Sequence, residues 1–285
     1  MSIITQPRFH IDFDTMHEVH PGCLKDADNV KHQYAGDRNL SARLRLHEKH
    51  STNKLGFFPW LHGLYRFTEN AVILEVGCGN AMQWKGKIGT IPPGGSLTLS
   101  DYSEGMLAAA KQNLAHHPTN ITFCQADIQD LPFDDHSFGT VIANHMLYHV
   151  PDIDKALAEV QRVLIPGGRF YAATNSNGGL RPFLHNAIKN FEPGTDAFTQ
   201  TLLFNMENGG EILRRHFSSI KRHDYADSLA ITETQDLMDW LESSMSMTGY
   251  NSQLQDKLYE YFEKIRVAEG AINIPKQACL FDCAE

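Results

Sequence analysis

The sequence predicts an α/β fold built on a doubly wound, mostly parallel sheet, and three observations support this. Short apolar runs that suit buried strands alternate with segments of helical periodicity from residue 71 to residue 175. A glycine-spaced turn follows the first run, at Gly77-Cys78-Gly79, and polar residues follow the next runs. An alternating strand–helix order implies parallel strands with helices on both faces. Ligands of such sheets bind outside the carboxyl ends of the strands, where the strand order reverses.

The first predicted strand, residues 71–76, ends in the glycine turn. Glycine is needed where the backbone turns sharply or approaches a ligand closely. Glu75 is out of place in a plain core, and a carboxylate there suits a ligand with positive charge or exposed hydroxyls. Turns that bind dinucleotides carry a third glycine three residues after the second, but here Met82 stands at that position. Glu75 and Met82 therefore disfavour a ligand that contains pyrophosphate.

Further strands are expected in the same region, each followed by a polar residue. The apolar runs predict strands at residues 96–100, 120–128, 138–145 and 169–174. An amphipathic helix over residues 156–164 stops at Pro166-Gly167-Gly168, before the last of these strands. Asp101 stands about twenty residues after the glycine turn, where a carboxylate commonly binds ribose hydroxyls. Asp127 and Asn144 stand at the ends of the next two strands, so one pocket is expected to collect these residues.

Composition excludes several classes of partner. The chain of 285 residues is 42% hydrophobic and 21% charged, which is typical of a globular protein. A formal net charge of −9 argues against a general nucleic-acid binder and against binding to an anionic membrane surface. No stretch approaches the about eighteen apolar residues of a spanning helix, and the N-terminus lacks a secretory pattern. We therefore expect neither nucleic acid nor membrane as a partner.

Cysteine and histidine usage indicates a reducing compartment and no metal site. An odd number of cysteines without framework spacing suggests reduced thiols and a cytoplasmic location: Cys23, Cys78, Cys124, Cys279 and Cys283. The chain has 15 histidines, but none forms a convincing metal-binding pattern with a supporting carboxylate. His145 and His149 have a helical spacing, yet they flank the junction between a strand and a loop. We expect no bound metal.

The run Glu75-Val-Gly77-Cys-Gly79 resembles the first motif of class I S-adenosylmethionine-dependent methyltransferases, Glu/Asp-x-Gly-x-Gly. Leu131-Pro132-Phe133 and Pro166-Gly167-Gly168 are similar to segments of the ubiquinone/menaquinone C-methyltransferase-like group. The resemblance covers roughly residues 71–175. It implies a Rossmann-like, seven-stranded sheet that ends in an antiparallel hairpin, with an N-terminal helical lid and a helical insertion after strand five.

The resemblance also implies a division of the chain. Residues 1–70 are expected to form the lid segment, and residues 71–285 the methyltransferase domain with a substrate-side insertion at 176–217. In the lid, Asp37 is expected to cap a helix that includes Leu44 and Leu46, and Pro59 to open a second helix. After the insertion we expect a strand at 218–225, helices at 234–243 and 254–268, and a final strand at 271–281.

By resemblance, the carboxyl edge of the sheet binds S-adenosylmethionine. Gly77 and Gly79 would let the backbone approach the methionyl part, and Asp101 would accept hydrogen bonds from both ribose hydroxyls. Asp127 would receive the adenine amino group, with the Ile128 amide at a ring nitrogen. Helices before the sheet commonly close over the cofactor in this family. The residues expected to bind the cofactor are Glu75, Gly77, Cys78, Gly79, Asp101, Tyr102, Met106, Asp127, Ile128, Asn144, Tyr34 and Arg38.

Three residues after the fourth strand are candidates for catalysis. Methyl transfer is an in-line displacement that depends chiefly on alignment, and a base is needed only if the acceptor arrives protonated. His145 and His149 are the candidate bases, because histidine titrates near neutral pH. Tyr148 is expected to orient the substrate or to face the sulfonium through its ring. The alternative for either histidine, and more so for His149, is a packing or capping role.

The predicted function is transfer of a methyl group from S-adenosylmethionine to an oxygen, nitrogen or carbon atom of a small-molecule acceptor. We expect a monomer or homodimer. Two alternatives remain open at this point. One is a non-catalytic nucleoside-binding module. The other is a nicotinamide-dependent oxidoreductase, which is less favoured because the third glycine and a Tyr-x-x-x-Lys pair after the fourth strand are missing.

Overall fold

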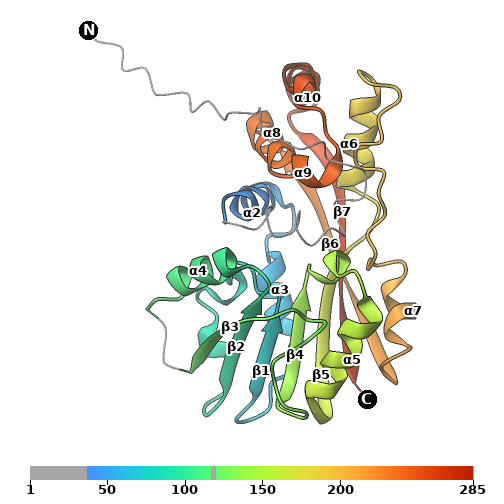
Figure 1. Cartoon of the computed structure of the whole chain (residues 1–285). Helices are drawn as coiled ribbons and strands as arrows, with labels where there is room; N and C mark the ends of the chain where they lie inside the picture. The colour runs from blue at the N-terminus through green and yellow to red at the C-terminus, as the bar shows by residue number, and fades with distance from the viewer. Residues whose placement is uncertain (1–36, 117–119, 285) are drawn as a thin grey trace.

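The computed structural model describes residues 37–116 and 120–284. Tyr34, one of the expected cofactor-binding residues, lies outside the described residues. The strands form one seven-stranded sheet in the order β3-β2-β1-β4-β5-β7-β6, with the order reversing between β1 and β4 (Figure 1). The strands are β1 Val72–Val76, β2 Ser96–Asp101, β3 Ile121–Gln125, β4 Phe138–Asn144, β5 Leu164–Asn175, β6 Ser219–Ile231 and β7 Ile272–Ala284.

The sheet is mixed in the predicted way. Strands β1 to β5 pair in parallel, and β7 runs antiparallel to both β5 and β6. The described helices are α2 Arg38–His50, α3 Phe57–Leu64, α4 Glu104–Asn113, α5 Ile153–Val163, α6 Leu180–Lys189, α7 Gly209–Leu213, α8 Thr234–Ser243, α9 Met245–Thr248 and α10 Gln255–Glu269. The expected fold class, with its final hairpin, N-terminal helices and helical insertion, is confirmed. None of the described helices is long and apolar enough to cross a membrane.

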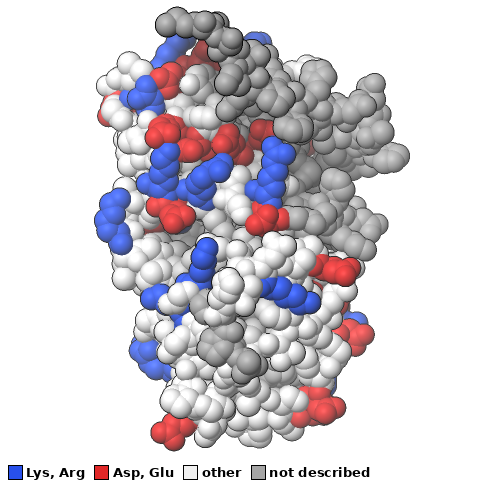
Figure 2. Space-filling model, turned by 90° about the vertical axis from the view of Figure 1, so that its left-hand side faces the viewer, with Lys and Arg blue, Asp and Glu red and all other residues white. Residues whose placement is uncertain are grey.

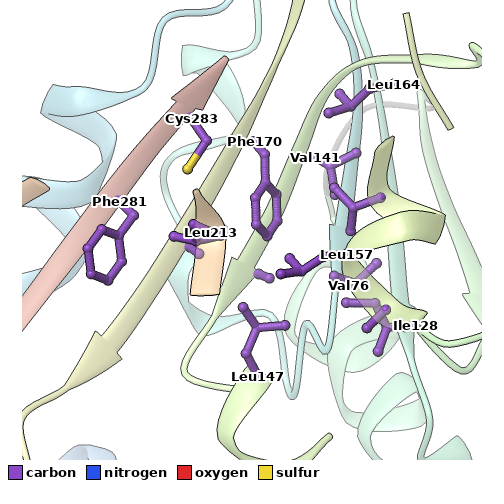
Figure 3. Packing of buried hydrophobic residues seen from close by; sticks show 14 of the residues in the cluster. Val76, Ile128, Val141, Leu147, Leu157, Leu164, Phe170, Leu213, Phe281 and Cys283 are labelled. Carbon is purple, nitrogen blue, oxygen red and sulfur yellow. The ribbon is translucent and has the colours of Figure 1, made fainter. Parts of the chain in front are cut away.

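Helices cover both faces of the sheet because successive strand residues point to opposite sides. Val76 of β1 and Leu157 of α5 belong to the hydrophobic cluster drawn in Figure 3. Leu74 of β1 belongs to the same cluster. Ile73 of the same strand packs on the other face, with Leu107 of α4 and other apolar residues. Burial of β1 on both faces explains its nearly unbroken apolar run.

A second hydrophobic core lies beyond the carboxyl edge of the parallel strands. Asn175, the last residue of β5, pairs with Ala278, so residues 272–277 of β7 extend past that edge together with their β6 partners. Helices α2, α6, α8 and α10 pack around this extension, which Figure 1 shows rising above the sheet. We call this second core the cap.

The N-terminal helices link the cap to the sheet. The helix predicted to include Leu44 and Leu46 is α2, and residues of α2 pack against α8. The predicted helix N-cap is wrong in detail, because Asp37 stands at the N-cap position but its side chain makes no hydrogen bond to the helix backbone. Arg45 pairs with Asp239 at 3.1 Å, and Lys49 with Asp236 at 2.8 Å. On this side of the molecule basic and acidic side chains are interspersed, so charge is balanced locally (Figure 2).

Two boundaries differ from the sequence expectation. Helix α3 begins at Phe57, so Pro59 is its third residue and not its first. This is compatible with a helix because proline's missing N–H falls in the first turn, where it has no partner in the helix. Strand β5 begins at Leu164 and includes Pro166-Gly167-Gly168, which the sequence assigned to a stop before the strand. A register irregularity against β4 accommodates these residues.

Candidate cofactor and acceptor site

The glycine turn between β1 and the following 3₁₀ turn is held in a conformation that requires glycine. Gly77 has φ +65° and Gly79 has φ +55°, both in the left-handed region. A Cβ atom at Gly77 would lie 2.8 Å from Cβ of Met146, in the loop after β4. A Cβ atom at Gly79 would lie 3.0 Å from Cδ2 of Leu40 in α2. The turn therefore meets both the β4 loop and the first helix, at the point where the strand order reverses.

Asp101 at the end of β2 is tied to this turn. One of its carboxylate oxygens accepts a hydrogen bond from the Gly79 amide at 2.8 Å, and the other accepts one from the Ser103 amide at 2.8 Å. Burial raises the pKa of Asp101, although both backbone hydrogen bonds act in the opposite direction. Each carboxylate oxygen has two lone pairs, so each retains capacity to accept a further hydrogen bond. This geometry suits two neighbouring hydroxyl groups.

Glu75 has side-chain partners that the sequence did not reveal. Its buried carboxylate accepts hydrogen bonds from the Gln83 side-chain amide and the Trp84 indole N–H, both in the 3₁₀ turn Met82–Trp84. Burial raises the pKa of Glu75 to about 7, although these two hydrogen bonds lower it. The carboxylate thus fixes the chain that follows the glycine turn. A role of Glu75 in cofactor binding stays a prediction.

The raised pKa predicts a specific dependence of stability on pH. The folded state holds the Glu75 proton up to about pH 7, whereas the unfolded chain releases it near the ordinary value of 4.5. Protonation therefore favours folding, and this contribution is lost as pH rises from 4.5 to 7, with an upper bound of about 3 kcal/mol. Glu75→Gln should therefore remove this decrease in the free energy of unfolding with rising pH. Urea unfolding at several pH values measures it, with exposed Glu69→Gln as the control. Parallel pH profiles for wild type and Glu75→Gln would contradict this expectation.

The residues expected around adenine lie at the ends of β2 and β3. Met106 is buried in α4, and the side chain of Tyr102 is 43% exposed. The carboxylate of Asp127 accepts a hydrogen bond from the Gln129 amide at 2.8 Å, which is the geometry of a loop turn. Ile128 packs into the core on the α5 face. The structure brings these residues to the edge that carries Asp101, and their contacts with a cofactor stay a prediction.

Asn144 connects the sheet to the segment before it. Its side-chain amide donates to the Tyr65 hydroxyl at 2.8 Å and to the Gln83 side-chain oxygen at 2.9 Å. Its own Oδ1 is buried and has no hydrogen-bond partner among the described residues. Burying an acceptor without a partner costs free energy. Asn144 therefore presents an acceptor that a ligand or water can satisfy.

His145 follows Asn144 in a left-handed conformation, with φ +52°. Its backbone amide donates to the Ala173 carbonyl at 2.9 Å, and its ring lies 4.9 Å from the ring of Phe57. Its Nδ1 is buried with no hydrogen-bond partner in the described part of the chain. Burial, and then the charge of Lys276, lowers the pKa of His145 to about 4. The imidazole is therefore neutral at pH 7.

The other two candidates for catalysis occupy the next turn, Leu147–His149. The rings of Tyr148 and His149 contact each other at 4.6 Å, and the His149 amide donates to the Met146 carbonyl. Tyr148 also packs against Leu202 of the predicted insertion. Tyr148 thus faces the insertion, whereas His145 faces α3. A catalytic role for Tyr148 and for His149 stays a prediction.

Comparison with known proteins agrees with this arrangement. Residues 74–172, which contain the glycine turn, Asp101, Asp127 and the loop after β4, match the sequence profile described as "Methyltransferase domain". This region is therefore similar to the methyltransferase domain family over about a third of the chain. The match ends inside β5, so the N-terminal helices, the cap and the final hairpin lie outside it.

Curated relatives are similar to part of this chain, and a solved structure shares its fold. The ubiquinone/menaquinone biosynthesis C-methyltransferase of Hahella chejuensis is 39% identical over 35% of this chain and 41% of its own length. A demethylmenaquinone methyltransferase of Staphylococcus epidermidis is 41% identical over 39% of this chain and 45% of its own length. The matches span less than half of each relative. A putative methyltransferase of Bacillus halodurans superimposes with a TM-score of 0.57, at 14% identity, over 80% of this chain and 97% of that one, which shows a shared fold.

Helix α2 approaches the methyltransferase domain from the N-terminal side. Leu40 lies over Gly79, and Arg38 begins the same helix two residues earlier. Helix α2 therefore lies against the glycine turn, and its closure over a cofactor stays a prediction. A contact between Arg38 and a cofactor stays a prediction.

Several polar residues near His145 were missed or only touched on from the sequence. The sequence did not place His47 of α2, Lys276 of β7 or Asp227 of β6 together with His145. The Lys276 ammonium pairs with the Asp227 carboxylate at 2.9 Å. Burial raises the pKa of Asp227, but hydrogen bonds from Lys276 and Ser51 outweigh burial and hold this pKa below its ordinary value. Strand β6 also carries Lys221, Arg222 and Asp224, so Asp227 gave no distinguishing signal in the sequence.

Proposed function

We propose that the protein is an S-adenosylmethionine-dependent methyltransferase that acts on a small molecule. The observation that carries this proposal is the junction of Gly79 and Asp101 at the point where the strand order reverses, inside a region similar to the methyltransferase domain family. A carboxylate with free acceptor capacity suits ribose hydroxyls and repels pyrophosphate. The same edge presents the unpartnered Oδ1 of Asn144.

The residues present fit the cofactor, which supplies a methyl group on a positively charged sulfur. Asp101 would hold the ribose, and the glycine turn would give the methionyl part a close approach to the backbone. Glu75 keeps Gln83 and Trp84 in place behind that turn. Holding reactants in line is worth several orders of magnitude in rate, so positioning is the main task of these residues. The acceptor would lie between α3 and the cap, on the side of the cap that α2 forms.

We propose a cytoplasmic enzyme with no nucleic-acid or membrane partner, a monomer or homodimer. The described cysteines are free, and two of them, Cys279 and Cys283, are buried in β7. Free thiols are typical of a reducing compartment. The net charge of −9 disfavours polyanionic partners.

Calorimetric titration of the full chain with S-adenosylhomocysteine tests the proposal, with NADH as a parallel ligand. We expect saturable binding of S-adenosylhomocysteine and none of NADH. Binding of NADH alone would overturn the assignment in favour of an oxidoreductase. Absence of binding to both would overturn it as well. Binding of S-adenosylhomocysteine without any methylated product, after incubation of methyl-labelled cofactor with small-molecule extracts, would favour the non-catalytic module.

Replacement of His145 should separate catalysis from cofactor binding. We expect His145→Ala to slow methyl transfer by about 100-fold, the order expected for a general base or an aligned acceptor contact. Its affinity for S-adenosylhomocysteine should stay within about twofold of wild type, because the imidazole faces Phe57 and not the glycine turn. His149→Ala serves as the comparison. An unaltered rate at all pH values for His145→Ala would remove His145 from the mechanism.

A further inference from the structure

We propose that the acceptor binds as an organic oxyanion, a carboxylate or an acidic phenolate, whose charged oxygen is received by Lys276 together with His47 and His145. The inference rests on the proposed function and adds the chemical class of the acceptor. These three residues come from β7, from α2 and from the loop after β4. The family resemblance carries no expectation for Lys276.

The fold brings these residues together above the sheet. Lys276 pairs in register with Asp227, beyond the position where β5 ends against Ala278. The ion pair therefore lies past the carboxyl edge that carries Asn144 and His145. Asp227 also accepts hydrogen bonds from the Ser51 hydroxyl and, at 3.0 Å, from the Asn53 amide, which fix the end of α2 to the hairpin.

Aromatic side chains lie between Lys276 and His145. The ring of Phe57 lies 4.9 Å from the ring of His145 and 5.2 Å from the ring of Tyr225. The Lys276 ammonium lies 6.0 Å from the Phe57 centroid and 5.4 Å from the Tyr225 centroid. Trp60 packs on Tyr225 at 5.0 Å. An open groove borders the ion pair, and its charged lining residues are Glu207, Arg222, Asp224, Asp227 and Lys276. His47 and His145 do not line this groove.

Hydrogen-bonding capacity in this cluster is unused. Nδ1 of His47 and Nδ1 of His145 are both buried, and neither has a hydrogen-bond partner among the described residues. The Lys276 ammonium has three N–H donors, and one of them donates to the Asp227 carboxylate. Buried polar atoms without partners are uncommon in proteins and indicate a ligand or water that completes them.

The charge around the two imidazoles favours an anion. Burial, followed by the charges of Lys276 and then His145, lowers the pKa of His47 to about 3. Asp227 acts on His47 in the opposite direction, but less strongly than Lys276. The charge of Lys276 also lowers the pKa of His145. The imidazoles are thus neutral hydrogen-bonding groups next to a cation, and both are weak bases.

An acceptor that arrives ionised suits these properties. Its oxygen lone pair forms the bond to the methyl carbon, the carbon–sulfur bond breaks, and its electron pair goes to sulfur. The anion and the sulfonium become a neutral ester or ether and a neutral thioether. No proton has to be removed, so the low basicity of His47 and His145 is no obstacle.

Matched pairs of anionic and neutral ligands test the inference on the full chain saturated with S-adenosylhomocysteine. The pairs are benzoate with benzamide, and 4-nitrophenolate with 4-nitroanisole, which distinguish the two kinds of oxyanion. We expect at least one anion to bind 10-fold or more tightly than its neutral partner, and Lys276→Met to reduce this preference below twofold. Exposed Lys221→Met, on the neighbouring strand, makes the same change in net charge and should keep the preference.

Histidine NMR provides a second readout that needs no activity. Lys276→Met should raise the pKa of His145 and His47 without any ligand, and Lys276→Arg should restore the wild-type values and the anion preference. Equal binding of anions and neutral partners by wild type would overturn the inference, as would an equal loss in Lys221→Met. Failure of S-adenosylhomocysteine itself to bind would instead overturn the proposed function. The two failures are therefore distinguishable.

Discussion

Replacing Asp101 by alanine should weaken binding of S-adenosylhomocysteine by at least about 100-fold. The reason is the loss of two hydrogen bonds from ribose hydroxyls to a charged carboxylate, each worth about 1.5–3 kcal/mol. A loss of about 3 kcal/mol corresponds to roughly two orders of magnitude in the dissociation constant. Calorimetric titration of the purified variant measures the change directly.

Asp101 also shapes the glycine turn, so the controls must separate binding from folding. Its carboxylate accepts hydrogen bonds from the Gly79 and Ser103 amides. Asp101→Asn keeps the shape and one acceptor oxygen, and should bind more weakly than wild type but more tightly than the alanine variant. Exposed Asp130→Ala removes a carboxylate elsewhere on the same edge and should leave affinity unchanged. Wild-type affinity in a folded Asp101→Ala protein would refute the assignment of this pocket.

The parts of the site that sequence reasoning found share a local cause. Gly77, Gly79, Asp101 and Asn144 each stand within a few residues of the carboxyl end of a strand that its own apolar run makes recognisable. In a parallel sheet the carboxyl ends meet at one edge, so strand ends far apart in sequence converge without further information. The order of strands and glycines was therefore enough to bring these residues to one edge, and cofactor binding there stays a prediction.

The parts that it missed depend on contacts between distant segments. Asp227 accepts its hydrogen bond from Ser51 across 176 positions of sequence, and His145 meets Phe57 only after α3 packs over the sheet. The extension of β6 and β7 past the sheet edge is what brings Lys276 there. The strand pattern predicted this hairpin. It predicted that β6 ends at residue 225, whereas β6 runs to Ile231. Because β6 was predicted to end at residue 225, Asp227 was not placed beside Lys276.

Glu75 illustrates a different limit. The sequence showed an acidic residue where a buried strand ends, and a ligand was the available partner. In the structure the Gln83 amide and the Trp84 indole N–H satisfy its carboxylate. A buried carboxylate requires hydrogen-bond donors. Gln83 and Trp84 follow Glu75 by eight and nine residues, and the 3₁₀ turn that contains them brings their donors back to the end of the strand. That turn follows Ala81, which has φ +56° and carries no glycine signal.

The second large effect is expected for Gly77→Ala, with Gly86→Ala as its matched control. Both glycines have positive φ, +65° and +70°, so alanine at either position carries a left-handed cost of about 1–2 kcal/mol. Only at Gly77 does the new Cβ meet another residue, at 2.8 Å from Cβ and Cγ of Met146, whereas nothing lies within 4 Å at Gly86. Overpacking of this kind adds about 1–3 kcal/mol.

The added cost at Gly77 also has a functional consequence. Met146 follows His145 directly, so relief of the overlap displaces the loop that carries the acceptor-side imidazole as well as the glycine turn. Gly77→Ala should therefore unfold at lower urea than Gly86→Ala, by a difference of about 1–3 kcal/mol in the free energy of unfolding. It should also bind S-adenosylhomocysteine more weakly than Gly86→Ala does. Equal stability and equal affinity in the two variants would show that the approach of Met146 to the turn is not what demands glycine at position 77.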